Sequence, residues 1–187
     1  MASSLRSANT ECQVEPSECN VSSSASVAAL AETVRSKFGR LDVLIVNSGY
    51  AGPRVLRMDQ DNPEDIQCTF DINVMGTYLA AHFFVPLLLG TEDGAKAFIA
   101  VGSLAAHATS GPLASMGYCV SKMAAVRIVE FAAAQFRDEG LMAVSVHPGA
   151  VKTEMSSQLP QEFARSELEF FFSYCPVRSK SRCADIP

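Results

Sequence analysis

The sequence predicts one α/β domain built around a doubly wound parallel sheet, because two patterns alternate along the chain. Short apolar runs rich in β-branched residues are typical of buried parallel strands. Such runs occur at residues 42–46, 96–101 and 141–146. A segment with helical periodicity or helix caps precedes each of them, at residues 25–38, 62–89 and 115–139. This alternation implies right-handed crossovers, so ligands are expected beyond the carboxyl ends of the strands.

The ends of the expected elements carry local signals. Serines precede the first helix as possible caps, and Gly39 follows it as a stop. Asn62 and Pro63 open the next helix as cap and first-turn residue, and Pro86 is expected to kink its far end. The run DVLIV at 42–46 is expected to be a strand buried on both faces.

Composition excludes several classes of function. The 187-residue chain has a formal net charge of −5, which gives no basic surface for nucleic acid. The start, MASSLRSANT, lacks the apolar core of a signal peptide, and the longest apolar run is interrupted by His82 and Pro86. We therefore expect a cytoplasmic protein without membrane association. The 6 cysteines form no C-x-x-C pair and have no His partner at metal spacing, so neither zinc nor a disulfide framework is indicated.

Tyr118 and Lys122 are four positions apart in an expected helix, so both side chains project from one face. A free phenol has a pKa of about 10 and is a poor acid or base near neutrality. An ammonium beside it favours the phenolate and lowers that pKa. The pair thus predicts proton transfer, whereas each residue taken alone is typical of a buried aromatic or a solvated lysine.

Four further segments surround this pair in a fixed order. They are LDVLIVNSG at 41–49, DINVMG at 71–76, AFIAVGS at 97–103 and VSVHPGAVKTEM at 144–155. With the Tyr-Lys pair, they resemble the short-chain dehydrogenase/reductase family over about residues 19–158. The resemblance implies a Rossmann-like fold and an NAD(P)-dependent oxidoreductase that transfers a hydride between nicotinamide and a carbonyl or secondary alcohol. Val46 and Ser48 depart from the family pattern, in which Asn and Ala are usual at these positions.

The resemblance assigns catalytic roles to individual residues. Tyr118 would be the general acid in reduction and the general base in oxidation. Lys122 would lower the Tyr118 pKa and hydrogen-bond the nicotinamide ribose. Ser103 would polarise the substrate carbonyl, with Ser110 and Ser115 as alternatives because the gap to Tyr118 is longer than is usual in the family.

Asn73 matches the helix asparagine that the family uses to hold a water in a proton relay reaching the lysine, and its alternative role is a buried polar residue that bonds the backbone. The resemblance also implies a set of cofactor-binding residues: Asn20, Val21, Asn47, Ser48, Gly49, Tyr118, Lys122, Pro148, Gly149, Val151 and Thr153. The expected cofactor is NADP or NAD, with NADP favoured.

Both ends of the chain depart from the family pattern. Residues 1–18 contain no glycine, so the first βαβ unit with its glycine-rich turn is expected to be missing. Its loss would remove the phosphate cradle and the residue that selects between NAD and NADP, and would leave the strand at 42–46 as an apolar edge. Residues 159–187 form a divergent tail, in which residues 170–172, all Phe, either pack on the core or remain exposed.

Three hypotheses remain open. The chain is an oxidoreductase acting on a small-molecule carbonyl or alcohol, or a truncated product that carries the catalytic set but cannot hold its cofactor. Alternatively, it is a non-catalytic interaction module that pairs through its long helices, which are also the expected route to a homo-oligomer. The sequence does not name a substrate.

Overall fold

The computed structural model describes residues 13–109 and 114–149. A 3-stranded parallel sheet, in the order β1-β2-β3, contains β1 (Val43–Val46), β2 (Ala97–Val101) and β3 (Met142–Val146). The α-helices are α2 (Ser24–Phe38), α3 (Pro63–Phe70), α4 (Gly76–Leu89) and α5 (Met116–Gln135). Short 3-10 helices cover Met58–Gln60, Leu104–His107 and Arg137–Glu139. The expected α/β fold with a parallel sheet is confirmed.

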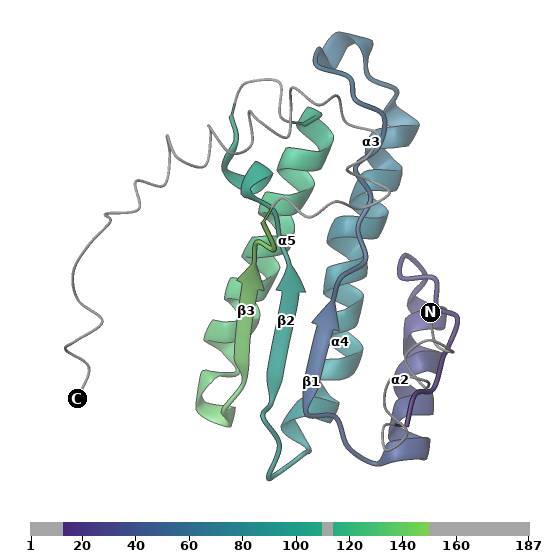
Figure 1. Ribbon diagram of the computed structural model, residues 1–187, viewed down its shortest axis with the longest axis vertical. Coiled ribbons are helices and arrows are strands. Elements are labelled where there is room, and N and C mark those ends of the chain that lie inside the picture. The colour runs from purple at the N-terminus through teal and green to yellow at the C-terminus, as the bar shows by residue number, and fades with distance from the viewer. Residues whose placement is uncertain (1–12, 110–113, 150–187) are drawn as a thin grey trace, which may run out of the picture.

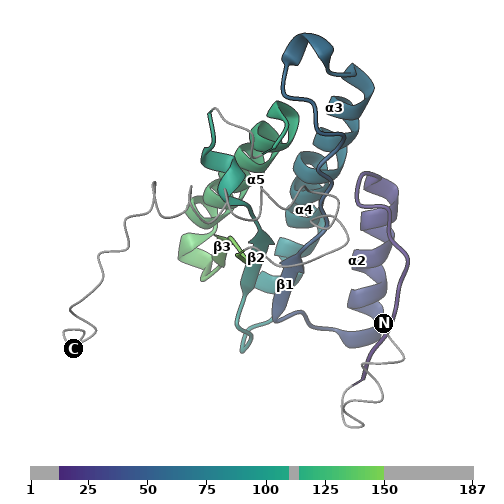
Figure 2. The same ribbon diagram turned by 45° about the horizontal axis from the view of Figure 1, so that its top comes forward.

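The helices form a layer on one side of the sheet (Figures 1 and 2). The main core lies between this layer and the strands, where Phe98 of β2 and Leu88 of α4 are both 0% exposed. Phe98 pairs in register with Leu44 on one side and Ala143 on the other. A second cluster joins α2 to α4 and contains Val27, Ala31, Leu79, Phe84 and Leu87. The first helix therefore packs on another helix through Val27, with Leu30 and Val34 partly buried, whereas Phe38 at its end is 44% exposed.

The opposite face of the sheet is open in the described part of the chain. Val43 and Ile45 of β1 are 43% and 60% exposed. The expectation that the run 42–46 is buried on both faces is therefore wrong. The physical reason is that the order β1-β2-β3 advances in one direction, so crossovers of one hand place α4 and α5 on the same face. As expected, β1 lies at the edge of this sheet.

Local signals predicted the ends of α2 and the start of α3 correctly, whereas the helix expected over 115–139 ends at Gln135 and a 3-10 turn follows it. The Ser23 hydroxyl accepts from the Ser26 amide at the start of α2, and Gly39 ends that helix in the left-handed region at φ 66°. Asn62 caps α3 by accepting from the Glu64 amide at 3.1 Å. The helix expected over 62–89 is interrupted by one π-helical turn, Asp71–Met75, which separates α3 from α4. A π-helical turn of this kind commonly occurs at a functional site.

The continuous helical stretch Pro63–Leu89 is long and apolar enough to cross a membrane by length and composition alone, because it contains an 18-residue window with a mean hydropathy of 1.6. Its α4 part carries core residues of this domain, among them Val85 and Leu88 at 2% and 0% exposure. A core helix of an α/β domain accounts for the same apolar composition.

Candidate active site

The loops that follow the three strands lie at the same edge of the sheet because the strands are parallel (Figure 1). The turn at 47–49 follows β1, Ser103 follows β2, and Pro148 and Gly149 follow β3. This is the edge at which an open α/β sheet binds ligands. Of the expected site residues, Val151, Thr153 and the alternative Ser110 lie outside the described residues.

Lys122 is buried at this edge, with 6% of its surface exposed. Its Nζ donates a hydrogen bond of 2.9 Å to the backbone carbonyl of Val101, the last residue of β2. Burial lowers the pKa of Lys122 from its ordinary value because the charged amine loses hydration. A Cβ added at Gly49 would lie 3.3 Å from Nζ, so the glycine keeps open the space next to the amine.

Tyr118 lies one turn before Lys122 on α5, and the structure brings the two side chains together as expected. Lys122 Nζ is 5.9 Å from the centroid of the Tyr118 ring. Tyr118 itself is half-buried. The cation thus lies near the phenol that it is expected to influence. Cys119, the next residue, is half-buried, and burial raises the pKa of its thiol, which suits packing better than nucleophilic chemistry.

Asn73 is 1% exposed and lies in the π-helical turn. Its Oδ1 accepts from the Tyr50 amide at 2.8 Å, and its Nδ2 donates to the Tyr50 carbonyl at 2.8 Å and to the Ser121 hydroxyl at 2.9 Å. Ser121 in turn donates to the Tyr118 carbonyl at 2.8 Å. One side chain therefore links the turn after β1, the π-helical turn and the helix that carries Tyr118 and Lys122.

The serine candidates have different surroundings. Ser103 directly follows β2 and caps the Leu104–His107 turn, where its hydroxyl accepts from the Ala105 amide at 3.2 Å. Ser115 caps α5 by accepting from the Tyr118 amide at 3.4 Å and donates to the Ala51 carbonyl at 3.4 Å. Both hydroxyls thus cap a helical turn, and that of Ser115 also donates to a backbone carbonyl.

The other residues expected to bind the cofactor have different surroundings. Asn20 is exposed, and its Oδ1 accepts from the amide and the hydroxyl of Ser22, so it orders the start of α2. Val21 packs against Gly76, where an added Cβ would lie 3.2 Å from Val21 Cγ2. Asn47 is exposed and Ser48 half-buried in the turn after β1. Pro148 and Gly149 are exposed beyond β3.

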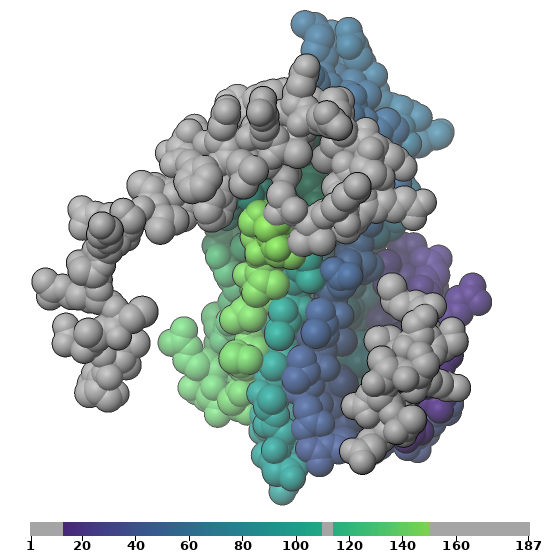
Figure 3. Space-filling model, viewed as in Figure 1, coloured from purple at the N-terminus to yellow at the C-terminus, as the bar shows by residue number. Residues whose placement is uncertain are grey.

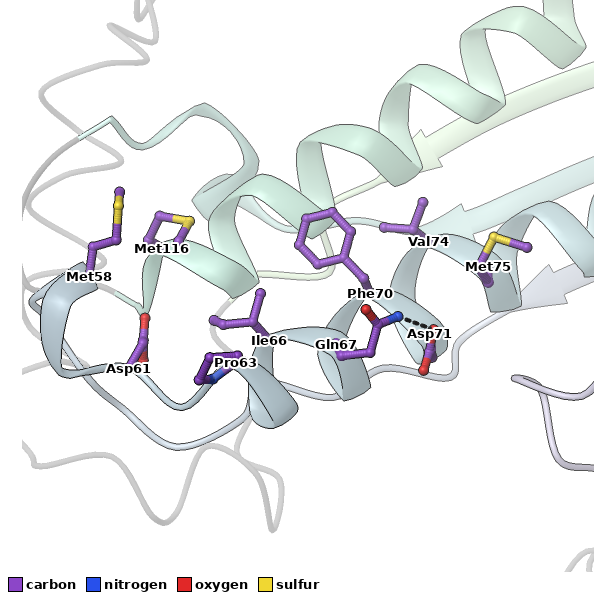
Figure 4. Close-up of a pocket in the computed structure, with 10 residues that line it drawn as sticks. All are labelled: Met58, Asp61, Pro63, Ile66, Gln67, Phe70, Asp71, Val74, Met75 and Met116. Atoms are coloured by element: carbon purple, nitrogen blue, oxygen red, sulfur yellow. Dashed lines mark hydrogen bonds between the residues drawn. The ribbon is translucent and has the colours of Figure 1, made fainter.

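A pocket of about 560 Å³ lies elsewhere, between α3, the π-helical turn and the first residue of α5 (Figure 4). Its walls are mainly apolar and comprise Met58, Pro63, Ile66, Phe70, Val74, Met75 and Met116, with Asp61, Gln67 and Asp71 as polar residues. Gln67 donates to Asp71 at 2.8 Å within it. None of the expected catalytic residues lines this pocket.

Two features of the site were not predicted from the sequence. Thr77 is buried, and its hydroxyl donates to the Asn73 carbonyl at 2.7 Å. A threonine four residues after Asn73 in a helix is a signal for this bond. The carbonyl of Val101 as partner of Lys122 had no signal, because a backbone acceptor carries no residue identity. In the described residues, no group of His, Cys, Asp or Glu is placed to hold a metal, and Cys19, Cys68 and Cys119 are free thiols.

Comparison with known proteins gives matches across this region. The family model described as enoyl-(acyl carrier protein) reductase matches residues 1–185. The short chain dehydrogenase mpl6 of Monascus purpureus is 37% identical over 143 residues, which cover 76% of this chain and 47% of that protein. The short chain dehydrogenase pigC of Monascus ruber is 36% identical over 140 residues, covering 75% and 45%.

Two solved structures show the same fold at low sequence identity. A 7α-hydroxysteroid dehydrogenase complexed with NADH and 7-oxo glycochenodeoxycholic acid superposes with a TM-score of 0.76 at 22% identity, covering 90% of this chain and 64% of that one. ElxO with NADP bound superposes with a TM-score of 0.67 at 23% identity, covering 82% and 57%.

The fold and these matches define an α/β protein of the Rossmann-like class. The chain belongs to the short-chain dehydrogenase/reductase family. It spans about half the length of the curated relatives that it matches.

The hydrogen bonds of Asn73 lead to a first prediction. Asn73→Ala leaves the part-buried amide and carbonyl of Tyr50 and the Ser121 hydroxyl without this partner, so we expect a loss of about 2–4 kcal/mol in the free energy of unfolding. Ser121→Ala removes only one of these bonds and should cost about 1 kcal/mol. Urea unfolding followed by circular dichroism measures both. Equal and small losses would contradict the linking role of Asn73.

The buried Lys122 leads to a second prediction. Its folded pKa lies below the ordinary 10.5, so between these two values the unfolded chain binds more protons and the free energy of unfolding rises with pH. Lys122→Met keeps most of the volume and removes the titrating group. We expect the free energy of unfolding of the wild type, minus that of the variant, to increase as the pH is raised toward 10.5. Urea titrations across alkaline pH measure this difference, and a falling difference contradicts the lowered pKa.

Proposed function

We propose that this chain carries the catalytic centre of an NAD(P)-dependent oxidoreductase that transfers a hydride between nicotinamide and a small-molecule carbonyl or secondary alcohol. The observation that carries this proposal is the burial of Lys122 beside Tyr118 at the ligand-binding edge of the sheet. A lysine with only a structural role extends its amine into water, because burial of a charged amine costs free energy. This amine is instead held at the edge by a backbone carbonyl.

The residues near Lys122 fit the nicotinamide-ribose end of such a cofactor. An ammonium has three donors, and one of them is used by the Val101 carbonyl. Gly49 leaves room beside the amine for an approaching ribose. When bound, the nicotinamide would supply or accept the hydride. The described residues contain no glycine-rich phosphate turn, so the fit concerns this end of the cofactor alone, and both NADP and NAD are retained, with NADP favoured.

The proton chemistry is assigned to Tyr118. Its hydroxyl gives a proton to the substrate oxygen in reduction and takes one in oxidation. The nearby Lys122 ammonium favours the phenolate through its charge. The Ser103 hydroxyl stabilises the charge that develops on the substrate oxygen. These roles remain our proposal for this chain, together with cofactor contacts from Asn20, Val21 and the turns at 47–49 and 148–153.

A proton relay from Asn73 to Lys122 is supported by the position of both side chains beside Gly49. The point where a Gly49 Cβ would lie is 3.3 Å from Lys122 Nζ and 3.6 Å from Asn73 Oδ1. An amide oxygen has two lone pairs and Asn73 Oδ1 uses one for the Tyr50 amide, so it can accept a further bond from a water that also bonds Lys122 Nζ. Glycine at position 49 thus places no side chain beside these two groups.

A second candidate function is an interaction module, and the open face and edge of the sheet favour it. Exposed apolar residues on the outer sides of α4 and α5, including Tyr78, Val120 and Phe131, suit pairing between two copies. A homo-oligomer through these helices is compatible with catalysis and is retained in the proposal.

Cofactor titration is the direct test of the proposed activity. NADPH, and then NADH, is titrated into the purified chain, which has no tryptophan, and nicotinamide fluorescence is followed. We expect saturable enhancement that Lys122→Ala weakens and that Tyr118→Phe leaves in place. In substrate screens, Tyr118→Phe should lower turnover by about 10²–10⁴-fold. A folded chain that shows no saturable enhancement with either cofactor would favour the interaction module.

Gly49→Ala tests the relay. The added methyl group occupies the space between Lys122 and Asn73, so we expect turnover to fall and its pH dependence to change, while the free energy of unfolding stays within about 1 kcal/mol of the wild type. Stopped-flow rates across pH, with thermal unfolding as the control for folding, measure this. Unchanged rates in a folded variant would show that no proton passes through this space.

A further inference from the structure

Thr77 is the second residue of α4, which directly follows the π-helical turn Asp71–Met75, and it is 5% exposed. Figure 3 shows the three strands on the near side of the molecule, and Figure 1 shows α4 behind them, in the helix layer. The Thr77 hydroxyl donates a buried hydrogen bond of 2.7 Å to the backbone carbonyl of Asn73. It therefore holds the backbone of the residue whose amide links the turn after β1 to α5.

The backbone hydrogen bonds change register next to Thr77. In an α-helix each amide donates to the carbonyl four residues before it, whereas the Gly76 amide donates to the Asp71 carbonyl, five residues before it. Helices depart from the regular ladder at such turns and where a side chain bonds into the ladder. Both features occur here, because the Thr77 hydroxyl bonds a carbonyl inside the π-helical turn. This position suits a donor that holds the turn in its π-helical form.

Ordinary helix stability does not account for this bond. A threonine hydroxyl that bonds the carbonyl four residues before it slightly destabilises a helix and often bends it. Thr33 makes such a bond to Ala29 in α2 at 2.8 Å. Thr69 makes one to Asp65 in α3, also at 2.8 Å. Those acceptors lie in α-helical turns, whereas the acceptor of Thr77 is the residue that the π-helical turn presents to the site.

The far end of the Asn73 side chain is also fixed. Its amide bonds both backbone groups of Tyr50 and the Ser121 hydroxyl, at 2.8 to 2.9 Å. All of these bonds form at once only when the backbone of Asn73 is correctly placed, because two side-chain torsions set the position of the amide. We propose that Thr77 is a positioning residue for the proton relay, whose hydroxyl fixes the backbone from which the Asn73 amide extends. This inference rests on the proposed function, because that function gives Asn73 its part in proton transfer.

Loss of the Thr77 hydroxyl removes a donor from the buried carbonyl of Asn73. The π-helical turn is then free to return to the regular α-helical ladder, and the side chain of Asn73 rotates about the helix axis as the register changes. Small displacements of this kind matter for chemistry, because a misplacement of about 1 Å can lower a rate by about 100-fold. The hydroxyl is therefore expected to affect the rate through Asn73, without contact with substrate or cofactor.

Three variants of the full 187-residue chain test the proposal. Thr77→Val keeps the branched shape and removes the hydroxyl, and Thr77→Ser keeps the hydroxyl as the conservative variant. Thr91→Val is the control for stability. The buried Thr91 hydroxyl donates to the Leu87 carbonyl and accepts from the Leu41 amide, beyond the opposite end of α4. Its loss removes two buried bonds and leaves the π-helical turn untouched.

The first measurement is the pair of NMR signals from the side-chain amide of Asn73. We expect Thr77→Val to shift this pair and to speed the exchange of its protons with solvent by about tenfold, because the amide then makes its bonds less well. Thr77→Ser and Thr91→Val should leave both the shifts and the exchange as in the wild type. This measurement needs neither cofactor nor substrate.

The second measurement is the oxidation of NADPH with the carbonyl compound that the wild type reduces fastest in the substrate screen. We expect Thr77→Val to lower kcat by about 10–100-fold while KM stays within about twofold, because the relay is displaced and binding is not. Thr77→Ser should restore most of the rate. Thr91→Val should keep the wild-type kcat at temperatures at which it is folded.

Unchanged Asn73 signals in a folded Thr77→Val variant would overturn the proposal, and so would shifted signals with an unchanged kcat. An equal loss of kcat in Thr91→Val would overturn it in favour of an effect of stability. A wild type that reduces no compound contradicts the proposed function instead, and the Asn73 signals still decide whether Thr77 positions this amide. If Thr77→Val does not fold, the Thr77 hydroxyl proton is measured in the unmodified chain, where slow exchange supports the proposal and exchange too fast to observe overturns it.

Discussion

The candidate site depends on one buried amide. Asn73 binds both backbone groups of Tyr50 and the hydroxyl of Ser121, and so holds together segments that are 23 and 48 residues away in sequence. The turn after β1 and the helix α5 approach each other at this point, which brings Gly49 to the amine of Lys122. A buried amide with these partners is specific in geometry, because each bond left unmade costs free energy. The π-helical turn at Asp71–Met75 presents this side chain.

The burial of Lys122, in contrast to that of Asn73, lowers the stability of the fold. Burial of its amine opposes folding, as the lowered pKa indicates, and the bond to the Val101 carbonyl offsets only part of that cost. The core around Phe98 and Leu88 supplies stability that is independent of the site. Stability does not explain why a charge is buried next to a tyrosine, and this is the reason for which we propose a chemical role at this position.

The sequence predicted the strands, most helix ends and the Tyr118-Lys122 pair, because these depend on local patterns of apolar residues, caps and spacing. It did not predict the π-helical turn or the Val101 carbonyl as the partner of Lys122, because neither depends on a residue type at a fixed spacing. The burial of the run at 42–46 was predicted wrongly. The apolar residues of a strand show that both of its faces can be covered, but they do not show whether other elements cover them. The alternative role of Asn73, a buried amide that bonds the backbone, agrees with its observed contacts.

The site and the open surface are physically separate parts of this structure. The bonds that order Asn73, Ser121 and Lys122 all form among the turn after β1, the π-helical turn, β2 and α5. They require no strand beyond the β1 edge, so the arrangement of the candidate catalytic groups can persist whatever covers the open face. Binding of a whole dinucleotide is a different matter, because its phosphates need backbone amides that the described residues do not gather in a glycine-rich turn. The residues around Lys122 can therefore be well ordered in a chain that binds the cofactor weakly. The order of the site and the affinity for the cofactor must be measured separately.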